Sequence, residues 1–243
     1  MDNLDEYLRE QALDLGTDFF GVADLTSARE YIERHGGAML AQFPRAVSVG
    51  VAMPSAIVDQ LPCHREDRAA AFAYRTHSYS VLNSRLDQLA SRLASTLQRE
   101  GHSAFPVRAS QPLPPADEEG LHAAFSHKLA AHLAGLGWIG KSCLLVTPRA
   151  GPRVRWASIL TDASLTPGQP MDERCGKCEV CIEACPPRAF TGRSFGPDEP
   201  REARYDAHKC HAYQRESEEF VGVRICGMCV YVCPHGRRNR NAG

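Results

Sequence analysis

Apolar residues recur with helical spacing in two stretches of the first half of the chain. Leu4, Leu8 and Ala12 lie on one stripe of a predicted N-terminal helix. A longer helix is predicted over about residues 79–100 and ends before Gly101, a residue typical of helix C-termini. Its apolar stripe consists of Leu82, Leu86, Leu89, Leu93 and Leu97.

Short apolar runs between these stretches have the length of strands. Residues 19–22 and 46–52 are two such runs, and two more strands are predicted near 142–147 and 153–161. A helix is predicted over about residues 122–134. Alternating strands and helices are typical of a layered sheet, although the strand order cannot be derived from the pattern.

The pattern changes at about residue 166. Residues 1–165 are therefore predicted to form an α/β domain, and residues 166–243 a second domain rich in Gly, Pro and Cys, with little helical periodicity. So few large apolar side chains give the second segment little hydrophobic core of its own. We expect bound metal to supply the missing stabilisation.

Charge and hydropathy exclude several classes of protein. The formal net charge of −1 gives no general attraction to nucleic acid. No apolar run approaches the length of a membrane span. The first residues are acidic and lack the basic and apolar regions of a signal peptide. We therefore predict a cytoplasmic protein without a membrane partner.

Ten cysteines are unusual in a cytoplasmic chain, where structural disulfides are rare. Eight of them fall between Cys175 and Cys233, and this clustering indicates metal binding. Cys63 and Cys143 stand alone and are interpreted as ordinary thiols.

The clustered cysteines have the spacing of bacterial ferredoxins that hold two [4Fe-4S] clusters. The first run is Cys175-x2-Cys178-x2-Cys181-x3-Cys185-Pro. The second run, Cys226-x2-Cys229-x3-Cys233-Pro, lacks one early cysteine, and Cys210 can take its place. In such proteins the last cysteine of each run binds the other cluster.

The predicted ligands of one cluster are Cys175, Cys178, Cys181 and Cys233. The predicted ligands of the other are Cys185, Cys210, Cys226 and Cys229. Zinc is the alternative metal, but zinc sites favour isolated Cys-x2-Cys pairs over triplets that end in Cys-Pro.

Three stretches of the sequence resemble the epoxyqueuosine reductase family, which is cobalamin-dependent and related to the reductive dehalogenases. These are residues 134–141 (AGLGWIGK), residues 206–213 around the lone Cys210 and, more weakly, residues 73–79. The resemblance implies a nitroreductase-like α/β domain that holds cobalamin, followed by a ferredoxin domain whose two clusters deliver electrons one at a time. It also implies an external low-potential electron donor. The residues that it places near cobalamin are Gly135, Gly137, Trp138, Ile139, Gly140 and Lys141.

The sequence departs from the family pattern at two points. Leu121 stands where the family has an acidic proton donor, and His127 matches a nearby family glutamate. His127 and His122 are therefore the predicted proton donors, since histidine exchanges protons near neutral pH. The family also has helical repeats that grip tRNA, and none follows in this sequence up to Gly243. We thus expect a short form that acts on a different, small-molecule substrate, with tRNA as a less favoured partner.

Two alternatives to a cobalamin-dependent reductase remain open. The chain can be an electron-transfer or activator protein that reduces a separate corrinoid protein or flavoprotein. The first domain can instead hold flavin, as nitroreductase-like folds do. Fold alone does not decide between these functions.

Overall fold

The computed structural model describes residues 3–110, 121–197 and 199–237. They form two compact units, each built from three separate stretches of chain. The first unit comprises Met1–Val51, Leu82–Leu136 and Arg155–Met171, and the second comprises Ala52–Val81, Gly137–Val154 and Asp172–Gly243. The units therefore interleave along the sequence, and the predicted domain boundary at residue 166 stays a prediction.

The first unit is built on a four-stranded sheet with the strand order β1-β2-β6-β3. Its strands are β1 (Phe19–Asp24), β2 (Arg45–Ala52), β3 (Ala104–Val107) and β6 (Val154–Thr161). β1 and β2 are antiparallel, as are β3 and β6. The strands predicted near residues 19–22, 46–52 and 153–161 are confirmed, whereas β3 was not predicted because four residues carry too short a pattern.

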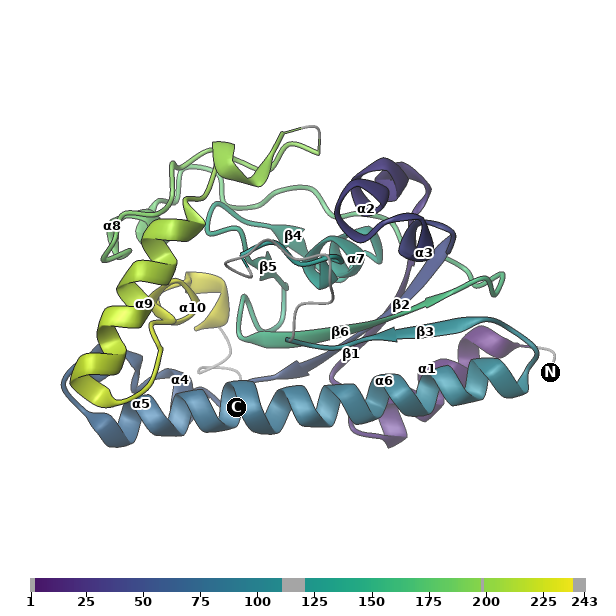
Figure 1. Cartoon of the computed structure of the whole chain (residues 1–243), viewed down its shortest axis with the longest axis horizontal. Helices are drawn as coiled ribbons and strands as arrows, with labels where there is room; N and C mark the ends of the chain where they lie inside the picture. The colour runs from purple at the N-terminus through teal and green to yellow at the C-terminus, as the bar shows by residue number, and fades with distance from the viewer. Residues whose placement is uncertain (1–2, 111–120, 198, 238–243) are drawn as a thin grey trace. The chain divides into compact units, whose positions relative to one another are not determined.

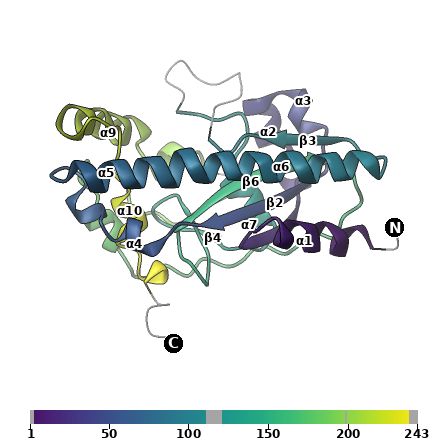
Figure 2. The same cartoon turned by 90° about the horizontal axis from the view of Figure 1, so that it is seen from below.

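Helices cover both faces of this sheet (Figures 1 and 2). One face carries α1 (Leu4–Asp14) and α6 (Leu82–Arg99), whose leucine stripe is buried as predicted. The opposite face carries α2 (Arg29–Gly36), α3 (Ala38–Ala41) and α7 (His127–Leu133). The first unit is thus a helix–sheet–helix sandwich, which agrees with the layered domain predicted from the sequence.

The C-terminal end of α7 packs unusually close to β1 because two glycines face it. A Cβ on Gly21 would lie 3.1 Å from the Ala134 carbonyl oxygen, and a Cβ on Gly168 would lie only 2.2 Å from the same atom. The Gly168 amide also donates a hydrogen bond to the Val22 carbonyl at 2.8 Å. Glycine at position 168 therefore sets how closely the segment after the sheet approaches the helix.

The second unit consists of short helices and one small hairpin. The hairpin pairs β4 (Trp138–Ile139) with β5 (Leu145–Val146). The helices are α4 (Ser55–Val58), α5 (Arg68–Arg75), α8 (Val180–Glu183), α9 (Ala207–Val221) and α10 (Met228–Tyr231). Short elements of this kind bury little apolar surface, as the composition of the C-terminal segment indicated.

Helix α9 forms after residue 166, in a segment whose sequence shows little helical periodicity. Its side chains are mostly polar, so no apolar stripe marks it, but its ends carry clear signals. Asp206 caps the N-terminus by accepting a hydrogen bond from the Lys209 amide. Gly222, with φ of +79°, ends the helix in the left-handed conformation that glycine adopts at little cost.

Three predicted bounds also change. Helix α7 begins at His127 rather than at residue 122, because Ser126 caps it there. The strand predicted at 142–147 is reduced to Leu145–Val146. The helix predicted from residue 79 starts at Leu82, and it is preceded by a π-helical turn, Thr76–Val81. Turns of this kind within helices are often associated with functional sites.

No helix within the described ranges combines the length and the apolar character that a membrane crossing requires.

Replacing Gly168 with alanine tests the close approach of α7. We expect Gly168→Ala to lower the free energy of unfolding by about 2–3 kcal/mol, since its Cβ would overlap a backbone oxygen that cannot move freely. Gly196→Ala is the control, because its Cβ would meet only the flexible side chain of Glu199. Chemical denaturation measures both, and equal effects of the two variants would contradict this packing.

Candidate metal centres

Four of the clustered cysteines line one small cavity of the second unit. They are Cys175, Cys178, Cys181 and Cys233, and they belong to two segments that lie far apart in the sequence. Cys181 lies on α8, and Cys233 lies two residues after the end of α10, which packs against α8. The structure thus gathers the four thiols that the spacing assigned to one cluster.

The charges of these thiolates interact strongly. Burial, followed by repulsion from the neighbouring Cys175, Cys233 and Cys178 thiolates, raises the pKa of Cys181 to about 11. At neutral pH the Cys181 thiol would therefore stay protonated without a cation. Iron relieves this repulsion and displaces the protons, so the arrangement favours a multinuclear cationic centre.

The other four clustered cysteines influence one another in the same way. Burial, together with repulsion from the Cys210 and Cys185 thiolates, raises the pKa of Cys226 to about 11. Burial also raises the pKa of Cys229, followed by the charges of Cys226, Cys210 and Cys185. The second predicted ligand set is therefore also drawn together, although it comes from three segments of the chain.

The two sets are close enough to interact. The pKa of Cys229, in the second set, is also raised by the charge of Cys181, in the first set. Two clusters at these positions would lie next to each other, as fast transfer of single electrons between them requires. The role of the eight cysteines as ligands stays a prediction.

The loop that was predicted to contact cobalamin lies beside the first cysteine set. Lys141 is only 8% exposed and lines the same cavity as the four thiols. Burial raises the pKa of Cys175, while the Lys141 backbone amide lowers it by donating a hydrogen bond. The buried Trp138 ring packs edge-on against His235, another cavity residue, with 4.9 Å between ring centroids.

The glycines of this loop allow other parts of the same chain to approach its backbone closely. A Cβ on Gly137 would lie 2.4 Å from the Val146 carbonyl oxygen, and a Cβ on Gly140 would lie 3.2 Å from the Cys175 sulfur. In the first unit, a Cβ on Gly135 would overlap the backbone of Gln169. Ile139 pairs with Leu145 in the hairpin. Packing within the protein is thus enough to explain why these positions are glycines. Contact between this loop and cobalamin stays a prediction.

Both ring nitrogens of His127 have hydrogen-bond partners within the first unit. Nδ1 lies 2.9 Å from the Ser158 hydroxyl on β6, and Nε2 lies 2.8 Å from the Arg108 carbonyl oxygen. Burial lowers the pKa of His127 to about 4, against the opposing effect of the Arg108 hydrogen bond. A neutral ring that links α7 to β6 explains this residue structurally, and the geometry lends no support to proton donation.

His122 has a different environment in the first unit. Its ring stacks on that of His35, with 5.9 Å between centroids, and His35 in turn packs against Tyr31 at 4.2 Å. Neither neighbour is a carboxylate or a cysteine of the predicted clusters. A catalytic role for His122 therefore rests on the sequence alone.

Sequence reasoning did not identify Arg153, a buried arginine near the first cysteine set. Its side chain is 3% exposed and pairs with Asp59 at 3.1 Å. It also donates a hydrogen bond to the Tyr231 carbonyl at 3.3 Å, and its charge lowers the pKa of Cys233, which burial raises. Arg153 thus supplies a fixed positive charge close to one predicted ligand. The residue stands outside every cysteine motif, so no spacing pattern pointed to it.

Comparison with known proteins supports the metal assignment. Residues 174–236 match the family model of the 4Fe-4S double cluster binding domain. This segment contains all eight clustered cysteines.

Curated relatives match a longer part of the chain. An epoxyqueuosine reductase from Pseudomonas aeruginosa is 30% identical over 177 residues, which are 68% of this chain and 43% of that protein. A tetrachloroethene reductive dehalogenase from Sulfurospirillum multivorans is 35% identical over 118 residues, covering 44% of this chain and 23% of that protein. The chain is homologous to the epoxyqueuosine reductases. These alignments span less than half of either relative.

Solved structures of the same two groups share the fold. A catabolic reductive dehalogenase superposes with a TM-score of 0.69 over 96% of this chain, at 22% identity and 32% coverage of that protein. An epoxyqueuosine reductase crystallised with a modified tRNA stem loop gives a TM-score of 0.60, also at 22% identity, over 96% of this chain and 65% of that protein. Homology to the epoxyqueuosine reductases thus includes the fold of both units.

Single cysteine substitutions in this chain test whether the last cysteine of each run binds the other cluster. We expect Cys185→Ala to retain about four of about eight iron atoms and to affect the same cluster signal as Cys226→Ala. Cys233→Ala should instead affect the same signal as Cys178→Ala. Iron analysis and electron paramagnetic resonance of anaerobically prepared protein measure this. Cys63→Ala is the control, because Cys63 is an exposed thiol outside both sets. If Cys185→Ala affected the same cluster signal as Cys178→Ala, the predicted exchange of ligands between the two runs would be wrong.

The pKa of His127 predicts how stability depends on pH. Because the folded pKa of about 4 lies below that of an unfolded histidine, the unfolded chain binds more protons between these values. The free energy of unfolding should therefore fall by about 1–2 kcal/mol from pH 7 to pH 5, allowing for partial exposure of the ring. Denaturation of the cluster-loaded protein measures this. His127→Gln should show a smaller fall, and an identical pH dependence would contradict the assignment.

Proposed function

We propose that the protein is a cobalamin-dependent iron–sulfur reductase, an oxidoreductase like its named relatives. The observation that carries the proposal is the pair of four-cysteine sets, which are close enough for the charge of Cys181 in the first set to raise the pKa of the buried Cys229 in the second. Two clusters at these positions accept electrons one at a time from an external low-potential donor. In this proposal the first unit is the nitroreductase-like domain that the resemblance implies.

Two buried polar atoms in the second unit are candidate partners for a corrin. His77 Nδ1 and Ser78 Oγ lie in the π-helical turn and are buried without a hydrogen-bond partner among the described residues. Buried polar atoms are normally paired, so these two are available to a polar ligand. The amide groups at the rim of a corrin are partners of the right chemistry.

Cobalamin, when bound, supplies a low-valent cobalt centre that attacks or reduces an electrophilic carbon. The chain's own residues would do the remaining work. The thiolates of the two sets hold the electron path, and His77 and Ser78 orient the group through its amides. Burial raises the pKa of Cys233, and the charge of Arg153, which is paired with Asp59, opposes this; Arg153 would thereby stabilise the thiolate that binds the first cluster.

The class of substrate is also part of the proposal. A small molecule was favoured from the sequence, but one structural relative was crystallised with a tRNA stem loop. RNA is therefore retained as a substrate class of equal standing, and a substrate screen must include both.

An electron-transfer protein is the second candidate function. It is favoured by the packing of Gly137 and Gly140, which are used to seat the hairpin and Cys175 rather than a ligand. In that case the clusters reduce a separate corrinoid protein or flavoprotein.

Anaerobic reconstitution with iron, sulfide and cobalamin separates these functions. We expect about one corrin per chain after desalting, with about eight iron atoms, and a cob(II)alamin resonance typical of the base-off form. Corrin retention should fall severalfold in His77→Ala, while Thr76→Ala, an exposed neighbour, should retain it. Full iron content without corrin would contradict the reductase and leave the electron carrier; co-purifying flavin would identify a flavoenzyme.

A further inference from the structure

Cys210, the lone cysteine between the two runs, receives a hydrogen bond from a side chain on its own helix. The Gln214 side-chain amide donates to the Cys210 sulfur at 3.3 Å. Both residues lie on α9, one helical turn apart, so the helix itself holds the amide over the thiolate. Gln214 is half-buried, which protects this contact from competing water.

A second side chain approaches the same sulfur from outside the helix. The Tyr205 hydroxyl hydrogen-bonds Cys210. A sulfur that binds a cluster carries no proton, so the phenol O–H is the donor of this bond. Its ring stacks on Phe190 with 5.3 Å between centroids, and a β-bridge between Phe190 and Tyr205 fixes the two backbones.

This pattern differs from that at Cys185, another member of the same set. Cys185 accepts its hydrogen bond from the Ala189 backbone amide at 3.3 Å. A backbone donor is supplied by the fold, whereas a side-chain donor is supplied by the choice of residue. Gln214 and Tyr205 are thus residues through which the electronic properties of this cysteine set can be adjusted.

We propose that Gln214 and Tyr205 raise the reduction potential of the second cluster by donating hydrogen bonds to its ligand Cys210. Reduction by one electron from an external low-potential donor adds one negative charge to the cluster, and part of this charge falls on the ligand sulfurs. Donors to sulfur stabilise the reduced state more than the oxidised state, which raises the potential. Both residues are positioning residues, because they act through Cys210.

This inference goes beyond the proposed function and holds for a corrin enzyme and an electron carrier alike. It depends only on a cluster bound by Cys210. Failure to retain cobalamin would therefore leave it intact, and failure of the potential to shift would leave the cobalamin proposal intact.

Two conservative variants of the full, cluster-loaded chain test the proposal. Tyr205→Phe removes the hydroxyl and keeps the stacked ring, and Gln214→Met removes the amide and keeps the side-chain length. Potentiometric titration followed by electron paramagnetic resonance gives the midpoint of each cluster. At a fixed potential, the ratio of reduced to oxidised second cluster should fall about three- to tenfold in each variant, tenfold being 59 mV. The first cluster should keep its midpoint.

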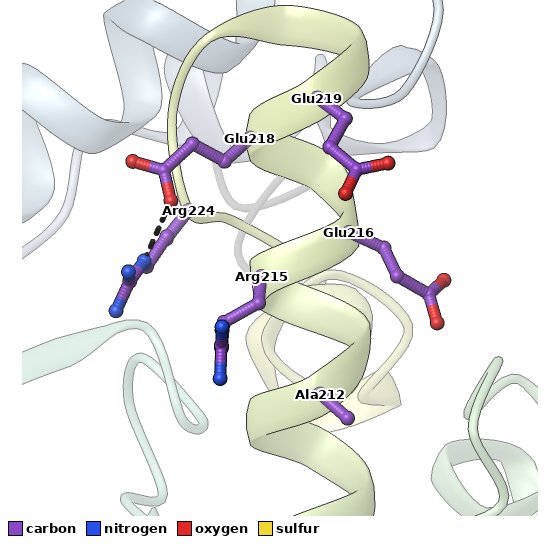
Figure 3. A pocket seen from close by; sticks show the side chains of 6 residues that line it. All are labelled: Ala212, Arg215, Glu216, Glu218, Glu219 and Arg224. Carbon is purple, nitrogen blue, oxygen red and sulfur yellow. Dashed lines mark hydrogen bonds and ion pairs between the residues drawn. The ribbon is translucent and has the colours of Figure 1, made fainter.

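Arg215→Met is the matched control on the same helix. Figure 3 shows Arg215 projecting from α9 on a charged surface, where the nearby Arg224 side chain donates to Glu218 at 2.8 Å. Arg215 is exposed, so water screens its charge and the loss of it should leave both midpoints in place.

Three results would overturn the proposal. The first is an unchanged midpoint of the second cluster in both variants, which would mean that the donors have no electronic effect. The second is an equal shift of both clusters' midpoints, which would indicate a general structural change. Both variants can lose the second cluster's iron while Arg215→Met keeps it, which would make the two donors necessary for assembly rather than for the potential.

Discussion

Burial of closely spaced thiols, together with repulsion between their thiolates, is the constraint on which the second unit depends. Burial and neighbouring charges raise the pKa of Cys181 and Cys226 to about 11, so each set of four thiols is unfavourable in its ionised form until a cation is present. Among the described residues, the unit has one longer helix, α9, beside short helices and a hairpin of two-residue strands to oppose this cost. Iron binding and folding of the second unit are therefore coupled, as in other small metal-stabilised domains.

In the predicted arrangement the last cysteine of each run binds the other cluster, so iron binding also depends on how the two runs come together. Cys233 returns from the last cysteine run to the cavity that Cys175 begins, so the first site closes only when both ends of the segment are in place. Cys181 of one set also lies close enough to Cys229 of the other for its charge to raise the pKa of Cys229. With the predicted crossed ligands, the chain would hold two one-electron centres side by side, which suits chemistry that needs electrons in succession.

Sequence patterns predicted the features that depend on regular spacing of residues along the chain. The leucine stripe of α6 and the strands β1, β2 and β6 follow directly from apolar periodicity, and the cysteine spacing indicated the metal class. Features that depend on tertiary proximity were missed. Helix α9 lacks an apolar stripe, Arg153 lies outside any motif, and the hydrogen bonds of His127 join α7 to residues distant in sequence. The loop glycines were singled out for contact with cobalamin, which stays a prediction, and their close neighbours within the protein could only be seen in the structure.

An anaerobic crystal structure of the iron-loaded chain, with anomalous scattering recorded at the iron edge, tests the crossed arrangement most directly. It should show two four-iron cubes, one bound by Cys175, Cys178, Cys181 and Cys233 and the other by the remaining four clustered cysteines. A cube bound by Cys175, Cys178, Cys181 and Cys185, or single metal ions at either set, would contradict it.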